Sequence, residues 1–293
     1  MRKAYIVLAH KHPRQLCRLI TALDDGLSTF FVHIDKRKDL QDFSRLADFG
    51  ARVVMVKREN SDWARTGIVR ATLNAMAMIN ERREAFDRVI LLSGQDYPIK
   101  SNDYINGFLA RSPHRIFMDH WEIPNFEKWK HRGGMSRIDK YFLGTSRREV
   151  TLARAANLMG IIVPPLRRKL PRGLRPYGGW MWWILDRAAV RCILQYVERN
   201  PDYLRYHRHT FAPDEVFFQT ILLNCGDEKL LSSICNDDMR YVVWHGSESH
   251  PEVLTKDRMP ALMSSNDLFA RKFDVDVDSE VLDLIDRALK PAG

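Results

Sequence analysis

Apolar and polar positions follow two different periods along the first hundred residues. Short apolar runs rich in β-branched residues, typical of buried strands, are followed by stretches in which apolar residues recur every three or four positions, as in a helix. The runs that predict strands are residues 5–8, 29–34, 53–56 and 89–92, and the stretches that predict helices are residues 14–23 and 66–80. This alternation predicts βαβ units and a parallel sheet with crossover helices.

The remaining two thirds of the chain continue the pattern less regularly. We predict strands at residues 115–118, 180–185 and 241–244, and helices at residues 150–160, 187–199, 213–223 and 279–289. Pro213 suits a first helical turn, and Asp214 and Glu215 in the same turn are favoured by the helix dipole. We find no internal repeat, low-complexity tract or linker. The sequence therefore predicts one α/β domain, residues 1–293, with a Rossmann-like, mostly parallel central sheet flanked by helices.

Composition and charge narrow the classes of partner. Hydrophobic residues make up 45% of the chain and charged residues 28%, as in ordinary folded proteins. The formal net charge of +9 indicates an anionic partner: a nucleotide, a nucleic acid, an acidic glycan or an anionic lipid surface. Four scattered cysteines without a CxxC pair argue against a structural zinc site and favour reduced thiols in the cytoplasm.

The N-terminus carries no signal for export. The apolar run at residues 4–9 is too short for a signal peptide, and His10 and Lys11 interrupt it. No apolar stretch approaches the roughly 20 residues that span a bilayer. We therefore expect a cytoplasmic protein, at most docked at the inner face of the plasma membrane.

Residues 147–175 form a basic segment broken by prolines. It contains a single acid, Glu149, and eight basic residues: Arg147, Arg148, Arg154, Arg167, Arg168, Lys169, Arg172 and Arg175. Such a segment could face an anionic membrane, where each nearby basic residue contributes about 1 kcal/mol to binding. It could equally form a solvated lid over an acceptor site, and the sequence leaves both alternatives open.

Candidate chemistry begins where two predicted strands end. Residues 91–100, LLSGQDYPIK, place an acid, an amide, a hydroxyl and an amine directly after a buried strand, at the edge where open α/β sheets bind ligands. Asp35 ends another strand, where an acid can accept hydrogen bonds from a ribose or a base. Residues 9–13, AHKHP, stand where a dinucleotide-binding protein has a glycine-rich phosphate loop. Dinucleotide binding is therefore not the main hypothesis.

Glu215 is the main candidate for a general base. Partial burial between aromatic and apolar neighbours raises the pKa of a carboxyl group toward neutrality, where it can accept a hydroxyl proton. The Pro-Asp-Glu sequence is also ordinary helix-capping chemistry, so capping remains the alternative. Trp180, Trp182, Trp183 and Trp244 make an aromatic neighbourhood that suits sugar rings, although we expect at least two of them to be core residues. Alternation along a strand predicts Trp180 and Trp182 on one face and Trp183 on the other.

Two charged clusters lie near the C-terminus. Arg271 and Lys272 lie between aromatic residues that could hold a cation against a phosphate, although a solvated charge pair is the commoner arrangement. Asp274, Asp276 and Asp278 alternate, which would place three oxygen ligands for Mg²⁺ or Mn²⁺ on one face. The pairs His10/His12 and His207/His209 have no nearby carboxylate pattern, and we expect surface or loop roles for them.

In combination, these motifs resemble the core-2/I-branching N-acetylglucosaminyltransferase and xylosyltransferase family, glycosyltransferase family 14, in what looks like a bacterial-type member. The similarity runs in order over nearly the whole chain. Residues 4–10 and 31–35 resemble the opening strands, and Trp63, Gly67 and Arg70 an aromatic–small–basic segment. Residues 92–100 resemble the S/G-x-D-(Y/F)-P-I-K signature, residues 212–215 the S-P-D-E motif, and residues 268–273 the L-F-A-x-K-F-D ending.

This resemblance implies a GT-A-like fold, a UDP-sugar donor and inversion at the anomeric carbon. Residues 1–110 would be the nucleotide-binding half, and residues 111–293 the acceptor-binding and catalytic half. Glu215 would be the base. The implied donor-binding residues are Ala9, His10, Asp35, Arg70, Asp96, Arg258 (or Lys256 in its place), Arg271 and Lys272, and the implied acceptor-binding residues are Glu122, Trp180 and Trp244.

Members of the family that resemble this chain can work without a divalent metal. Because residues 93–96, SGQD, stand where many GT-A enzymes carry a DxD motif, we expect no metal cofactor, with Lys272 and a second cation on the diphosphate. The sugar could be GlcNAc, xylose, galactose or glucose. The expected acceptor is a glycan or lipid-linked glycan in cell-envelope polysaccharide synthesis, with possible peripheral contact to an anionic membrane and no nucleic acid partner.

Two alternatives remain. A metal-dependent glycosyltransferase would use Asp96 or the Asp274/Asp276/Asp278 cluster, and sensitivity to EDTA would identify it. A non-catalytic protein that binds RNA or anionic lipid would show tight, salt-sensitive binding without turnover.

Overall fold

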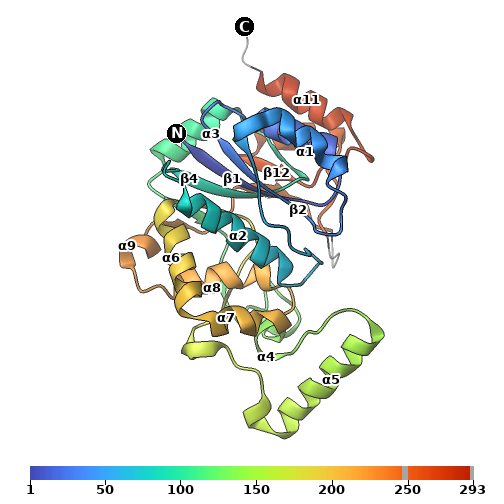
Figure 1. Ribbon diagram of the computed structural model, residues 1–293, viewed down its shortest axis with the longest axis vertical. Coiled ribbons are helices and arrows are strands. Elements are labelled where there is room, and N and C mark those ends of the chain that lie inside the picture. The colour runs from blue at the N-terminus through green and yellow to red at the C-terminus, as the bar shows by residue number, and fades with distance from the viewer. Residues whose placement is uncertain (246–249, 291–293) are drawn as a thin grey trace.

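A seven-stranded sheet forms the centre of the protein in the computed structural model, which describes residues 1–245 and 250–290 (Figure 1). Its strands lie in the order β10-β6-β9-β4-β1-β2-β3. Their bounds are β1 (Lys3–Ala9), β2 (Thr29–Ile34), β3 (Val53–Met55), β4 (Arg88–Ser93), β6 (Ile116–Met118), β9 (Trp183–Leu185) and β10 (Ile234–Cys235). Strands β4, β1, β2 and β3 are parallel, as are β10 and β6, and only β9 runs antiparallel to its neighbours. The predicted α/β class with a mostly parallel sheet is confirmed.

Helices cover both faces of this sheet because its central strands are apolar on both sides. Along β1, Tyr5 and Val7 join one core and Ile6 and Leu8 the other. The first core is closed by α1 (Pro13–Leu23), α3 (Asn102–Arg111) and α11 (Glu280–Leu289). The second is closed by α2 (Gly67–Glu81), α6 (Arg187–Arg199), α7 (Pro201–Tyr206) and α8 (Phe217–Leu223), which lie on the opposite side of the sheet (Figure 1).

Two smaller sheets bring distant segments together. Strand β12 (Phe269–Arg271) lies between β11 (Arg240–Val242) and β5 (Asp96–Pro98). It pairs antiparallel with β5 so that Arg271 lies opposite Asp96. Strand β7 (Trp121–Glu122) pairs with β8 (Tyr177–Gly178). The turn after β4 and the C-terminal motif at residues 268–273 are therefore neighbours, although they lie far apart in the sequence.

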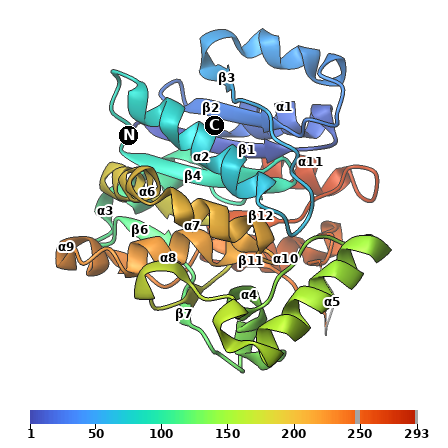
Figure 2. The ribbon, with the colours of Figure 1, turned by 60° about the horizontal axis from the view of Figure 1, so that its bottom comes forward.

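The remaining helices lie around the lower part of the molecule in Figure 2. They are α4 (Ser136–Asp139), α5 (Arg147–Ile162), α9 (Glu228–Leu231) and α10 (Met259–Ser264). A separate 3-10 segment, Gln41–Arg52, lies between β2 and β3 in the sequence. Helix α5 is longer than the helix predicted at residues 150–160, because Ser146 and Glu149 form a capping box that starts it at Arg147. None of the helices in residues 1–245 and 250–290 has both the length and the apolar content needed to cross a bilayer.

Two predicted elements differ from the structure. The continuous helix expected over residues 213–223 is a separate 3-10 turn, Pro213–Glu215, followed by α8, because Val216 leaves the helical region at φ −135°. The strand expected from residue 180 begins only at Trp183. Gly179 lies against the main chain of Asp119, where an added Cβ would come within 1.9 Å of the carbonyl oxygen, and this close approach holds the chain outside the ladder.

A buried ion pair joins the N-terminal strand to the loop before β2 and to α3. The Lys3 side chain is fully buried, and its Nζ donates to Asp25 Oδ2 at 2.5 Å and to Asn106 Oδ1. Burial opposes ionisation of Asp25, but the hydrogen bonds from Lys3, Ser28 and Asn106 hold the pKa of this carboxyl well below its usual range.

Replacing Lys3 by Met should therefore lower the free energy of unfolding at neutral pH. We expect a loss of about 3 kcal/mol, because a carboxylate is left without its cation in a largely buried site. Urea unfolding followed by circular dichroism measures it. The double variant Lys3→Met/Asp25→Asn should recover part of the loss, and equal losses in the two variants would contradict a charge-based origin.

Candidate active site

The parallel strands end together at one edge of the central sheet, as the sequence predicts. Ala9 lies opposite Ile34, and Leu8 opposite Ser93. The main chain closes this edge tightly, since Asp35 N donates to Ala9 O at 3.0 Å and Gly94 N donates to Leu8 O at 2.9 Å. Three of the sequence motifs thus meet where ligands bind in open α/β sheets.

Asp35 lies at this edge with its carboxylate buried and already bonded. It accepts hydrogen bonds from the main chain and guanidinium of Arg37 and from Ser61 N and Oγ. Burial raises the pKa of Asp35, but these bonds outweigh it and hold the pKa well below its usual range. The carboxylate is therefore ionised, and a ribose or base would have to replace one of these partners or bind through Arg37.

His10 and Arg70 lie near the same edge. Burial, followed by the charges of Lys11 and Lys38, lowers the pKa of His10, so that the ring is neutral at physiological pH. Arg70 lies in the first turns of α2, half exposed, with Nη2 3.4 Å from Glu59 Oε1. The main chain of Glu59 accepts a hydrogen bond from Lys36 N, next to Asp35, so this segment connects Arg70 to the strand end.

Asp96 does not face an open position. Its side chain is fully buried, Oδ2 accepts a hydrogen bond from Ser93 N, and Oδ1 lies 3.3 Å from Arg271 Nε. Arg271 in turn lies 4.2 Å from the ring centre of Trp182. Asp96 and Arg271, both expected at the donor, therefore form an ion pair in which Asp96 is fully buried.

Lys272 follows β12 directly and lies beside the segment at residues 252–254. Its main chain pairs with the segment at residues 252–254, where Leu254 N donates to Lys272 O at 2.9 Å. Arg258 donates from Nε and Nη2 to the two carboxylate oxygens of Glu252, at 3.0 and 2.8 Å. Burial and then the charges of Lys272 and Arg271 lower the pKa of His250. We call the group of Lys272, Arg271 and Arg258 the positive site, because cations of this kind suit an anion such as a diphosphate.

Glu215 lies in the 3-10 turn Pro213–Glu215 and faces the guanidinium of Arg137, a residue that the sequence did not predict. Arg137, on α4, donates from Nε and Nη2 to Glu215 Oε2. The Arg137 guanidinium lies 3.9 Å from the ring centre of Trp129, which fixes its position. Because both hydrogen bonds end on Oε2, Oε1 is the oxygen that can accept a proton from a bound hydroxyl.

Glu215 and Asp214 titrate together. Burial raises the pKa of Glu215, and the charge and hydrogen bonds of Arg137 counteract part of that rise. Burial and the neighbouring Glu215 charge raise the pKa of Asp214 to about 7. The direction agrees with the expectation for a general base, and the apparent values belong to the pair because the two carboxyl groups interact.

Four tryptophans form a continuous aromatic wall beside Glu215. Trp180 stacks on Trp244 with ring centres 5.3 Å apart, Trp121 meets Trp180 at 5.7 Å, and Trp129 meets Trp121 at 5.1 Å. The wall is tied to the base, since Gly179 N donates to Glu215 O at 2.9 Å. Trp180 and Trp244, both predicted to bind the acceptor, are neighbours, and 41% of Trp244 is exposed.

The other two tryptophans named above have different surroundings. Trp183 is buried in the core against Phe218, and Trp182 is buried beneath Arg271, so two of the four are core residues as expected. Trp180 and Trp182 do not share a strand face, because both precede β9.

Glu122 is placed beside the wall, next to Trp121. Its carboxylate is exposed and accepts a long hydrogen bond, 3.4 Å, from Tyr177 Oη. Sequence analysis missed Trp121, Trp129 and Arg137. The cluster of aromatic residues around Glu122 was a signal for the first of these, whereas Arg137 has no local signal.

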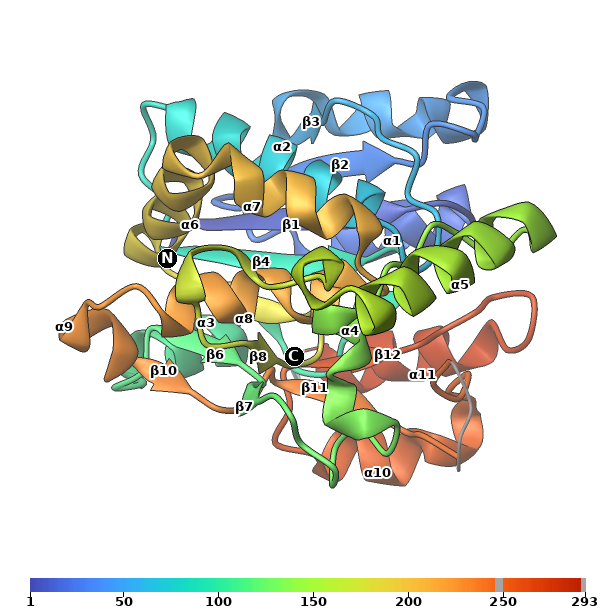
Figure 3. The same cartoon turned by 90° about the horizontal axis from the view of Figure 1, so that it is seen from below.

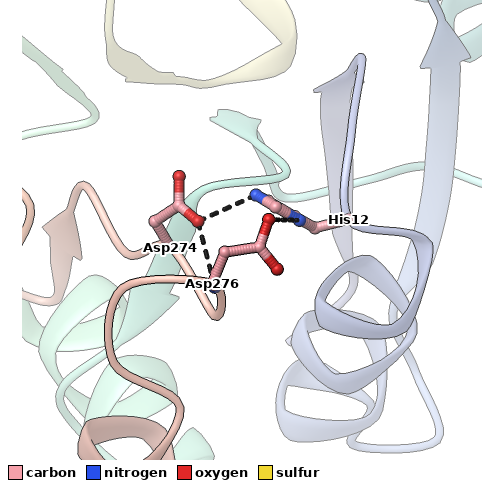
Figure 4. Close-up of side chains that lie close together, drawn as sticks. All are labelled: His12, Asp274 and Asp276. Carbon is pink, nitrogen blue, oxygen red and sulfur yellow. Dashed lines mark hydrogen bonds and ion pairs between the residues drawn. The ribbon is translucent and has the colours of Figure 1, made fainter.

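The aspartates at residues 274–278 do not share one face, contrary to the prediction. The chain turns there, so Asp278 accepts hydrogen bonds from the main chain of Lys256 and Glu280, away from the other two. Asp274 lies 2.9 Å from His12 Nε2, and Asp276 lies 3.7 Å from His12 Nδ1 (Figure 4). Asp274 also lies 2.5 Å from Lys11 Nζ.

His12 therefore has carboxylate partners that its local sequence did not reveal, and His207 is fully buried rather than at the surface. His12, Asp274 and Asp276 could each offer one ligand atom to a cation, all within 4.8 Å of one another. The Lys11 ammonium already neutralises part of the Asp274 charge.

The arrangement combines three features that could take part in a reaction. A carboxylate with a raised pKa can take a proton, an aromatic wall can hold the faces of sugar rings, and a positive site at the strand ends can stabilise charge on a leaving phosphate.

The sequence model of one family, described as "Branch: Core-2/I-Branching enzyme", matches residues 3–268. Xylosyltransferase 2 of Homo sapiens is 26% identical over 98% of this chain and 33% of its own length. The Beta-glucuronosyltransferase GlcAT14A of Arabidopsis thaliana is 26% identical over 96% of this chain and 62% of its own length. The chain thus spans about a third of the xylosyltransferase and less than two thirds of the glucuronosyltransferase.

Solved structures resemble the chain only distantly. HddC from Yersinia pseudotuberculosis is 13% identical and covers 65% of this chain and 79% of its own, with a TM-score of 0.31. A likeness of this size supports no argument about function.

Proposed function

Since the chain belongs to the Core-2/I-Branching enzyme family, we propose that it is an inverting glycosyltransferase that moves a sugar from a UDP-sugar to a glycan hydroxyl. The proposed process is cell-envelope polysaccharide synthesis, with a glycan or lipid-linked glycan as acceptor. Residues 1–110 would supply most of the nucleotide site, and residues 111–293 the acceptor site, the base and the cations.

In the proposed reaction, Glu215 takes the proton of the acceptor hydroxyl. The acceptor oxygen then forms a bond to the anomeric carbon from the face opposite the nucleotide, the bond from that carbon to the β-phosphate oxygen breaks, and its electron pair leaves with UDP. Lys272 and Arg258 would stabilise the charge on the departing diphosphate, which is the role a metal has in related chemistry. Arg137 holds the base in place on the wall.

The observation that carries this proposal is the position of Glu215. Its carboxylate has a raised pKa and is bound by Arg137, which packs on Trp129 of the aromatic wall. Two further members of that wall, Trp180 and Trp244, come from separate segments of the chain. The names of the relatives support sugar transfer as the reaction, with xylose and glucuronic acid among the donors to test.

A panel of UDP-sugars measured by thermal shift tests the donor and the need for metal. The panel contains UDP-GlcNAc, UDP-xylose, UDP-galactose, UDP-glucose and UDP-glucuronic acid, each with and without EDTA. The correct donor at a hundred times its Kd should stabilise the protein by about 2.7 kcal/mol, a shift of roughly 5 °C. We expect EDTA to leave the shift unchanged. If no UDP-sugar stabilises the protein, the proposed donor class is wrong.

A metal-dependent transferase is the second candidate, and one observation favours it. His12, Asp274 and Asp276 form a cluster that could hold a cation. Asp274 follows Lys272 by two residues, which places the cluster close to the proposed diphosphate site. Asp96 is less suitable because its carboxylate is buried against Arg271. A thermal shift that EDTA abolishes and Mn²⁺ or Mg²⁺ restores would support this candidate.

A further inference from the structure

The basic segment at residues 147–175 forms a hairpin that extends from the body of the protein. It consists of α5, the 3-10 turn Pro164–Leu166 and the loop that returns to the body. In Figure 1 the hairpin lies at the bottom of the molecule, far from the central sheet, and in Figures 2 and 3 one end of α5 lies beside α4. Only Ala153 and Gly160 of the helix are buried. A hollow of about 340 Å³ separates its inner side from the body. Packing of the core therefore does not explain the composition of this helix.

The far end of the hairpin is apolar and exposed to solvent. Ile161 and Ile162 are 65% and 64% exposed, as much as residues in a polar loop. The apolar tip, as we call it, consists of Leu158, Met159, Ile161, Ile162, Val163 and Leu166. A contiguous exposed apolar patch of this kind is uncommon in a protein without a partner for it and marks an interaction surface.

Basic residues flank the apolar tip along the chain. Arg154 lies one turn before Leu158 on the same helix, and Lys169 follows the tip on the returning chain, both exposed. Arg167 and Arg172 pair with Asp139 and Asp202. The single acid of the segment, Glu149, is bound by Arg65 at the root of the hairpin and lies away from the tip. The apolar tip therefore lies between two exposed basic residues, Arg154 and Lys169, with no acid of the segment beside it.

We propose that the hairpin docks on an anionic lipid bilayer, with the apolar tip inserted among the headgroups and acyl chains and the basic residues against lipid phosphates. Aliphatic side chains flanked by Lys and Arg have the composition of an interfacial membrane anchor. A nucleic acid would use the charges and leave the isoleucines in water. A second copy of this chain would bring one positive rim against another.

The root of the hairpin lies beside the aromatic wall. Phe142, just before α5, contacts Phe211, and Phe211 lies 5.3 Å from the Arg137 guanidinium that holds Glu215. Docking through the tip would thus hold the acceptor side of the site near the lipid. This position suits an acceptor anchored in the same bilayer, a consequence that rests on the proposed function, whereas docking itself does not.

Cosedimentation of the full chain with vesicles tests the proposal without any sugar donor. We expect binding to vesicles of phosphatidylcholine with phosphatidylglycerol, and far weaker binding to phosphatidylcholine alone. Ile161→Ser/Ile162→Ser should lower the partition coefficient on the anionic vesicles about tenfold or more, because the bilayer takes up less apolar area. Arg154→Gln/Lys169→Gln should lower it about tenfold through loss of charge.

The matched control is Leu27→Ser/Val277→Ser, which removes two aliphatic side chains that are 52% and 61% exposed and lie outside the hairpin. It should bind vesicles like the wild type, and the unfolding temperature of each variant verifies folding. Wild-type protein that does not bind anionic vesicles would overturn the proposal, and so would a tip variant that binds them as well as wild type. A tip variant with normal vesicle binding but altered use of a soluble acceptor would identify the hairpin as a lid instead.

Discussion

Glu215→Gln is expected to reduce transfer by about 10²–10⁴-fold, because an amide cannot accept the hydroxyl proton at the reacting oxygen. Gln keeps the size of the side chain and can still accept a hydrogen bond from Arg137. Donor binding should therefore survive, and the loss should appear in kcat. Steady-state kinetics with the donor identified by thermal shift, together with that shift for the variant, measure both quantities.

The pH profile gives this prediction a second measurement. A general base works only when ionised, so the rate should fall as pH drops through the apparent pKa of the Asp214–Glu215 pair, which burial raises above the usual carboxyl range. Glu215→Gln should lose the acidic limb assigned to that pair. Glu198→Gln, the same change at an exposed position of α6, is the control. Near-normal turnover in Glu215→Gln would remove Glu215 from the role of base.

Elements with strong local signals were predictable from sequence. Helix α6 was predicted at residues 187–199 and occupies Arg187–Arg199. Its apolar face repeats with helical period, and Asp186 accepts a hydrogen bond from Ala189 N at the point where the helix begins. Strand β2 was likewise predicted at its observed bounds, because a six-residue run in the middle of a parallel sheet is apolar on both faces.

Elements decided by distant contacts were not predictable. The Pro-Asp-Glu sequence suits the start of an α-helix and a 3-10 turn equally well. What separates Glu215 from α8 is its main-chain bond to Gly179 and the bond of Ala212 N to Ala64 O, both with segments far away in the chain. The strand expected from residue 180 failed for a similar reason, since Gly179 lies against Asp119.

The site shows the same division. Sequence motifs indicated the strand ends, Glu215 and two tryptophans of the wall, Trp180 and Trp244, because each lies in a motif with a characteristic composition. Arg137 was not predicted, because it lies in a four-residue helix whose sequence contains no recognisable motif. Asp96 looked accessible in a polar turn, but β12 covers it and supplies Arg271 as its partner. Sequence therefore identified the kinds of residue present and could not show which acids were already paired.

Lys272→Ala should lower kcat by roughly 10²–10³-fold, because a fixed charge on the leaving diphosphate acts mainly in the transition state. Lys272 belongs to the positive site. Burial lowers the pKa of His250 most, and the charges of Lys272 and Arg271 lower it further, so these cations lie near its ring. Lys272 is the residue that the family resemblance places on the diphosphate, and its neighbour Arg271 pairs with Asp96. UDP should bind the variant much more weakly, whereas the affinity for uridine should change little.

Calorimetric titration with UDP, UMP and uridine separates a phosphate contact from a general loss of structure. A contact with the β-phosphate predicts a loss of affinity that grows from uridine to UMP to UDP, since only charged oxygens lose their partner. Lys229→Ala, which removes an exposed lysine on α9, should leave all three affinities unchanged. Equal losses for uridine and UDP would show that Lys272 supports the site without touching phosphate, and the charge on the leaving group would then need another partner, with Arg258 or a metal at His12 and Asp274 as the next to test.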